Sequence, residues 1–225
     1  MTATGEPLEI EVGDRVGRVS GLLLRPPEPW AGYVLAHGAG AGMTHPFMES
    51  IARALMARGI ATLRYQFPYT EAGARRPDPP RVLIATVRAA VARAEELLPG
   101  LRLFAGGKSL GGRMTSHAAA ERKLDHLAGL IFLGFPLHPP KRPAIERAEH
   151  LARVGLPLLF LQGTRDDLAD LELVRDVCAG LGDRATLHVV EGADHSFGVL
   201  KRSGRTGPEV LDELADTIAG WCRSV

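Results

Sequence analysis

The chain alternates short apolar segments with longer segments of helical spacing, and this alternation constrains its fold more than any other feature. Apolar runs predict strands over residues 33–36, 60–65, 101–105, 127–133, 157–162 and 186–190. Helical spacing predicts helices over residues 47–58, 80–98, 110–122, 168–181 and 208–222. Such alternation implies right-handed crossovers and a mainly parallel sheet with helices on both faces, which is an α/β fold.

The segments that fall outside this alternation have their own interpretation. Residues 8–12 and 16–24 flank a Gly13-Asp14-Arg15 turn and predict an antiparallel hairpin at the sheet edge. Proline-rich loops at 66–80 and 134–143 follow predicted strands, at the end where ligands bind in open α/β sheets. No repeat or linker interrupts the chain, so we expect one domain over residues 1–225.

The sequence between the predicted strand at 101–105 and the next helix reads Gly107-Lys108-Ser109-Leu110-Gly111. This is Gly-x-Ser-x-Gly, the nucleophile elbow of serine hydrolases, in which glycines leave room around a tight turn. Two other interpretations exist. A phosphate-binding loop would need glycine where Arg102 stands. A serine that only caps the helix remains open.

The elbow needs a base and an acid to activate the hydroxyl of Ser109. His195 follows the last predicted strand and should therefore lie at the same sheet edge as Ser109. Asp166 comes early in the loop after the preceding strand and is our choice for the acid, while Asp167 is expected to cap the helix and Asp170 to lie in its first turn. The order Ser109, Asp166, His195 is the one expected for this elbow.

An oxyanion hole requires two backbone N–H donors. One should be that of Leu110, directly after the nucleophile, and the other that of Ala39, with Gly40 as second choice, in the glycine-rich loop over residues 37–42. That loop could also be a dinucleotide fingerprint. Its glycines lie at intervals of two, however, and Arg64 ends the next strand where an acid is required.

Several longer motifs carry a resemblance to a known family. They are HGAGAGMTHPFM (37–48), RYQFPYTEAG (64–73), GGKSLGGR (106–113), FPLHPP (135–140), QGTRDDLA (162–169) and GADHSF (192–197). On these motifs the chain resembles the α/β hydrolases, and within them a compact group related to dienelactone hydrolases and to KANL-type chromatin-complex subunits. The resemblance implies a fold without a large lid and a Ser109, Asp166, His195 triad. Dienelactone hydrolases use cysteine in place of Ser109, so their substrate is not carried over.

Further side chains near the motifs could line the site. Phe67 and Tyr69 follow one strand, and Leu137 and His138 follow another, so these four are candidates for substrate binding. Core packing is an equally good explanation for Phe67.

Four basic side chains have less certain roles. Lys108 is expected to form an internal ion pair, with an acidic substrate group as the alternative. Arg113 is expected to be a structural hydrogen-bond donor. His37 should brace the oxyanion loop, and His45 should lie on the surface or cap a helix.

Composition excludes several function classes. The net charge is +1 and the basic clusters are short, so we expect no binding to nucleic acid. The longest apolar run is about eleven residues, too short for a bilayer, and MTATGEPLEIEV does not resemble a signal peptide, so a cytoplasmic protein is expected. Cys178 and Cys222 lie in predicted helices without a metal-binding spacing. No metal or other cofactor is expected.

The residues together indicate a small serine hydrolase acting on a small-molecule ester, with thioester or amide as lesser possibilities. Two alternatives stay open: a binding or scaffold protein that keeps the fold without turnover, and an acyltransferase that uses the same triad. Substrate identity and oligomeric state cannot be read from the sequence.

Overall fold

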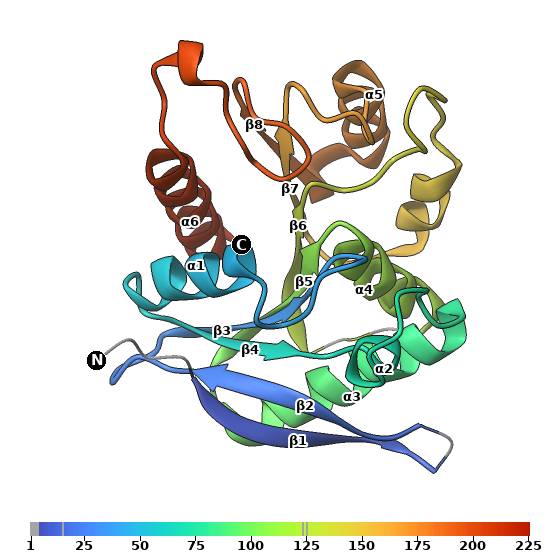
Figure 1. Ribbon diagram of the computed structural model, residues 1–225, viewed down its shortest axis with the longest axis vertical. Helices are drawn as coiled ribbons and strands as arrows, with labels where there is room; N and C mark the ends of the chain where they lie inside the picture. The colour runs from blue at the N-terminus through green and yellow to red at the C-terminus, as the bar shows by residue number, and fades with distance from the viewer. Residues whose placement is uncertain (1–4, 15, 123, 125) are drawn as a thin grey trace.

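The computed structural model describes residues 5–14, 16–122, 124 and 126–225, and the described part is built on an eight-stranded sheet (Figure 1). The strands are β1 (Glu6–Gly13), β2 (Gly17–Leu24), β3 (Ala31–Ala36), β4 (Ile60–Tyr65), β5 (Arg102–Lys108), β6 (Leu127–Leu133), β7 (Leu158–Gly163) and β8 (Ala185–Val190). Their order is β1-β2-β4-β3-β5-β6-β7-β8. β1 and β2 form the expected antiparallel hairpin, β2 also pairs antiparallel with β4, and the remaining pairs are parallel.

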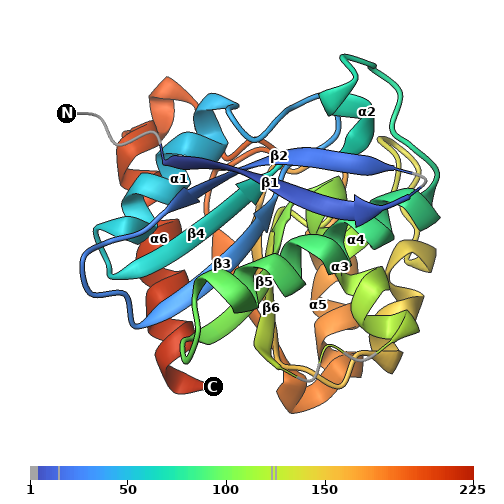
Figure 2. The same cartoon turned by 90° about the horizontal axis from the view of Figure 1, so that it is seen from below.

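Helices cover both faces of the sheet. The α-helices are α1 (Pro46–Met56), α2 (Pro68–Glu71), α3 (Pro80–Leu97), α4 (Leu110–Glu121), α5 (Leu171–Leu181) and α6 (Gly207–Ser224). The 3₁₀ helices are η1 (Glu146–Arg153), η2 (Gly182–Arg184) and η3 (Lys201–Ser203). α1 and α6 lie against one face and α3, α4 and α5 against the other, with the β1–β2 ribbon crossing one end (Figures 1 and 2).

The central strands are buried on both sides, which explains their nearly continuous apolar sequence. Successive side chains of a strand point to opposite faces. In β3, Tyr33 and Leu35 join the core under α1 and α6, whereas Val34 and Ala36 join the core under α3 and α4. The parallel α/β architecture expected from the sequence is confirmed.

Some element boundaries differ from the prediction. α5 begins at Leu171 rather than at residue 168, because the side chain of Asp170 accepts hydrogen bonds from the N–H groups of Glu172 and Leu173 at 3.0 and 3.3 Å. Asp170, not Asp167, is therefore the N-cap. The expected loop over residues 66–80 contains the single turn α2. Arg15 of the hairpin turn lies outside the described residues.

Both cysteines are buried free thiols, and burial raises the pKa of Cys178 to about 11 and that of Cys222 to about 12. They are core packing residues. Of the helices that the structure describes, none is long and apolar enough to cross a membrane.

Candidate active site

Ser109 lies on a sharp turn between the end of β5 and the start of α4. Its φ of +49° and ψ of −115° are unusual for a non-glycine residue and store backbone strain at the turn. The turn is packed closely against β3. A Cβ atom on Gly107 would lie 2.1 Å from the carbonyl oxygen of Ala36, and one on Gly111 would lie 2.6 Å from the same oxygen. The glycines of the motif are therefore required by this close approach.

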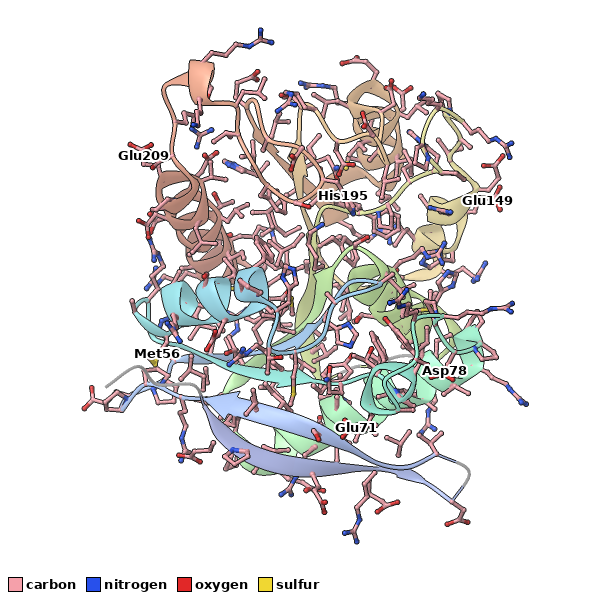
Figure 3. All side chains as sticks on the ribbon, in the orientation of Figure 1. Met56, Glu71, Asp78, Glu149, His195 and Glu209 are labelled. Atoms are coloured by element: carbon pink, nitrogen blue, oxygen red, sulfur yellow. The ribbon has the colours of Figure 1, made fainter. Side chains whose placement is uncertain are left out.

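His195 lies in the loop after β8, near the middle of the molecule (Figure 3). Its Nε2 atom is 2.9 Å from Oγ of Ser109. The loop is shaped by Asp194, whose Oδ1 accepts hydrogen bonds from the N–H groups of Ser196 and Gly198 at 2.8 and 2.9 Å. The turn around Asp194 therefore holds the imidazole of His195 next to the hydroxyl of Ser109.

Asp166 contacts the other side of the imidazole, with Oδ2 2.7 Å from Nδ1 of His195. Its fully buried carboxylate also accepts hydrogen bonds from Nε2 of Gln162 at 2.5 Å and from the N–H of Leu168 at 2.8 Å. These donors stabilise the ionised carboxylate. An Nδ1–H that donates to Asp166 leaves Nε2 as an acceptor facing Ser109.

One glycine-dependent approach and one hydrogen bond bring the loops of Asp166 and His195 together. A Cβ atom on Gly163 would lie 2.2 Å from the carbonyl oxygen of Ala193, so the loop after β7 can pack directly on the loop after β8. The N–H of Arg165 also donates to the oxygen of Ala193 at 2.9 Å. The contact explains how residues far apart in the chain meet at Ser109.

Both residues expected to supply the oxyanion donors lie near Ser109, since Leu110 follows it directly and Ala39 lines the same hollows. Leu110 is the first residue of α4, and N–H groups in a first helical turn lack an acceptor within the helix. Gly38 lies beside the elbow: a Cβ atom at this position would be 3.6 Å from Cβ of Ser109. His37 braces this loop as expected: Nδ1–H donates to the oxygen of Gly38 at 2.8 Å, and Nε2 accepts from the N–H of Phe67 at 3.1 Å. Burial lowers the pKa of His37.

Two hollows open beside Ser109, and Ala39 lines both. The first, of about 180 Å³ and here called the Phe47 hollow, is lined by Gly38, Ala39, Gly40, Ala41, His45, Phe47, Met48, Lys108, Ser109, His195 and Ser196. The second, of about 310 Å³ and here called the Arg113 hollow, is lined by Ala39, Ser109, Leu110, Arg113, Pro136, Pro139, Pro140, Arg147 and Leu168. A substrate carbonyl at Ser109 would have room on either side.

The lining differs from the sequence-based prediction. Phe67, Tyr69, Leu137 and His138 are all buried and line neither of these hollows. Phe67 packs edge-on against His37, and Nε2 of His138 accepts the N–H of Asp170 at 2.8 Å, so packing and loop bracing account for these positions. His45 caps α1 as expected, accepting from the N–H of Phe47 at 3.3 Å.

Sequence analysis missed Phe47 and Arg147 as lining residues. Phe47 stands inside the HGAGAGMTHPFM motif, which was a usable signal. Arg147 stands in the short helical segment after the second proline-rich loop, where no motif marks it.

Lys108 does not form the ion pair expected from the sequence. Within the described residues its buried Nζ has no hydrogen-bond partner and no carboxylate within ion-pair distance. The atom lies 5.6 Å from the ring centre of Phe197 and close to Gly134, where a Cβ atom would approach it to 3.1 Å. Burial lowers the pKa of Lys108 to about 8, partly opposed by the charges of Asp166 and Asp194.

We expect Lys108→Met to stabilise the protein at pH 7 by about 1–3 kcal/mol, because it replaces a buried, unpaired ammonium with an apolar side chain of similar length. The folded pKa of about 8 lies below the ordinary 10.5, so the cost of the charge is fully present below pH 8. This cost decreases as pH rises from 8 to 10.5, because in that range Lys108 is protonated in the unfolded chain but neutral in the folded protein. Urea unfolding at pH 7 and pH 10 checks this; an equal effect at both values would contradict it.

Comparison with known proteins agrees with the fold. A family described as "Alpha/beta hydrolase domain" matches residues 30–223. A serine hydrolase homologue from Coxiella burnetii superposes with a TM-score of 0.75 at 23% identity, covering 96% of both chains. A dienelactone hydrolase from Anabaena variabilis gives 0.76 at 21% identity, covering 96% of this chain and 95% of that one. A serine hydrolase without a lid from Xanthomonas campestris gives 0.74 at 21% identity, over 97% and 95%. Similarity at 21–23% identity shows that this chain and these three proteins share a fold.

Proposed function

Because the chain belongs to the alpha/beta hydrolase domain family, we propose that it is a serine hydrolase that cleaves carboxylic esters of small molecules. One observation carries the proposal. His195 lies between Ser109 and Asp166, at 2.9 Å from the hydroxyl oxygen and 2.7 Å from the carboxylate oxygen. This is the arrangement that deprotonates a serine hydroxyl at neutral pH.

In the proposed reaction, Oγ of Ser109 attacks the ester carbonyl while its proton passes to Nε2 of His195. The carbonyl oxygen becomes an oxyanion stabilised by the N–H groups of Leu110 and Ala39. The tetrahedral intermediate collapses, the C–O bond breaks, and His195 gives its proton to the leaving alcohol. The acyl group is now on Ser109. Water, deprotonated by the same histidine, releases the acid and restores the hydroxyl.

Asp166 serves both halves of the reaction by keeping the proton of neutral His195 on Nδ1 and by stabilising the imidazolium. Its hydrogen bonds from Gln162 and Leu168 favour the charged carboxylate, and its complete burial strengthens the interaction with the imidazole. The modest volumes of the two hollows, about 180 and 310 Å³, favour small substrates.

A fluorophosphonate probe tests the proposal directly, because its phosphorus reacts with a serine hydroxyl only when a neighbouring base activates it. We expect stoichiometric labelling, located at Ser109 by peptide mass spectrometry, and no labelling of Ser109→Ala. Folded protein that takes up no label would instead support a binding or scaffold role for the same fold.

A further inference from the structure

The Arg113 hollow contains an unusual pair of charges. Among its lining residues only Arg113, on α4, and Arg147, on η1, are ionisable, and both are cations. The other walls are mostly apolar, formed by three prolines and two leucines. Two like charges facing one small space repel each other, which is unfavourable unless something between them carries the opposite charge.

Neither arginine is neutralised by the protein. Within residues 5–14, 16–122, 124 and 126–225, neither guanidinium has a hydrogen-bond or ion-pair partner, and the Nε of Arg113 is buried without an acceptor. The structural role expected for Arg113 is therefore not observed. Several other arginines of the described residues are paired; Arg58, for example, contacts Asp212 and Asp216 at 3.1 and 2.6 Å.

Other basic side chains lie close to Arg113. Burial, followed by the charge of Arg147, lowers the pKa of Arg113. Behind it, the rings of His117 and His150 stack at 3.6 Å, and burial together with the charges of His117, Arg153 and Arg113 lowers the pKa of His150 to about 3. His150 is therefore neutral, but the guanidinium charges remain.

We propose that the Arg113 hollow binds a carboxylate carried by the substrate, so that the preferred esters are those with an anionic end. The proposal rests on the esterase function proposed above. A guanidinium offers a planar fork of N–H donors that matches a carboxylate, and its hydrogen bonds would satisfy the unpartnered arginines and relieve their mutual repulsion.

The geometry also limits the length of the substrate. Arg113 stands four residues after Ser109, so its Cα is displaced by one helical turn, about 6 Å along α4. Because Ser109 and Arg113 line the same hollow of about 310 Å³, a carboxylate held there and a carbonyl at Ser109 would be joined by a short linker of a few carbon atoms. The apolar walls formed by Pro136, Pro139 and Leu168 suit such a hydrocarbon linker.

Two pairs of matched esters test the proposal, one for each side of the scissile bond. 4-Nitrophenyl hemiglutarate and 4-nitrophenyl valerate differ in charge on the acyl side. 4-Butyryloxybenzoate and 4-butyryloxybenzamide differ in charge on the alcohol side. We expect wild type to give a kcat/KM at least about tenfold higher for the charged member of one pair. Rates of spontaneous hydrolysis are subtracted using Ser109→Ala.

The variants Arg113→Gln and Arg147→Gln should each lower that charged-to-neutral ratio by about tenfold to a hundredfold, mainly through KM. Lysine at either position should restore part of it. A ratio is insensitive to loss of folded enzyme, which affects both esters equally. Arg25→Gln is the matched control, since Arg25 is exposed and follows β2 at the opposite end of the parallel strands, and it should keep the wild-type ratio.

The outcomes separate the two proposals. If wild type hydrolyses the esters without preferring either charged one, or if both glutamine variants keep the wild-type ratio, the carboxylate site is refuted while the esterase function stands. If wild type cleaves none of the four esters and takes up no fluorophosphonate, the proposed function itself is refuted.

Discussion

Ser109→Ala should lower kcat/KM for a small neutral ester by roughly 10⁴ to 10⁶. The alanine removes the atom that forms the acyl-enzyme, and His195 is left without the hydroxyl that now lies 2.9 Å from it. The residual rate would come from oxyanion stabilisation and binding alone, with water attacking directly. Steady-state hydrolysis of 4-nitrophenyl valerate measures the change.

The matched control is Ser50→Ala, which removes an exposed hydroxyl on α1 that contacts none of the three triad residues. It should keep activity within about twofold, as expected for a surface substitution. A Ser109→Ala variant that is folded and retains a tenth or more of the wild-type rate would show that another group is the nucleophile.

The elbow and its partners could be predicted because each depends on local chain geometry or on strand order. Gly107 and Gly111 mark a turn that no larger residue could make, given their approach to Ala36. His195 and Asp166 each follow a parallel strand, and parallel strands bring the loops at their carboxyl ends to one edge. The sequence therefore contained the residues that the structure brings together.

The surroundings of Ser109 could not be predicted, because they depend on how distant loops pack. Lys108 looked like half of an ion pair, yet the carboxylates near it are directed elsewhere: Asp166 toward His195, and Asp194 toward backbone N–H groups of its own turn. Arg113 faces Arg147 only because η1 packs against α4 after a proline-rich loop. Spacing along the chain does not encode such contacts.

The charged side chains around Ser109 make its surroundings cationic. Lys108, Arg113 and Arg147 all border the hollows beside Ser109, whereas the carboxylate of Asp166 is fully buried behind His195. A cationic environment stabilises an oxyanion at Ser109 and attracts anionic substrates. Asp166 supplies the one negative charge of the triad and opposes this positive environment at the imidazole.

Asp166→Asn should lower kcat by about 10⁴, even though the amide has nearly the same shape as the carboxylate. An asparagine NH₂ group donates to Nδ1 of His195, which moves the imidazole proton to Nε2 and removes the acceptor that faces Ser109. The substitution also removes the negative charge that stabilises the imidazolium of His195. The rate is measured from pH 6 to 9 with a neutral ester.

Asp167→Asn is the control for Asp166→Asn, because Asp167 is the adjacent residue, carries the same functional group and is exposed. Asp167 has no contact with the imidazole, whereas Asp166 lies 2.7 Å from it and is held by Gln162 and Leu168. The control should keep its rate within a few-fold of wild type. If Asp167→Asn were the inactive variant and Asp166→Asn the active one, the acid of the triad would be misassigned, since the acid must contact His195 to stabilise its imidazolium.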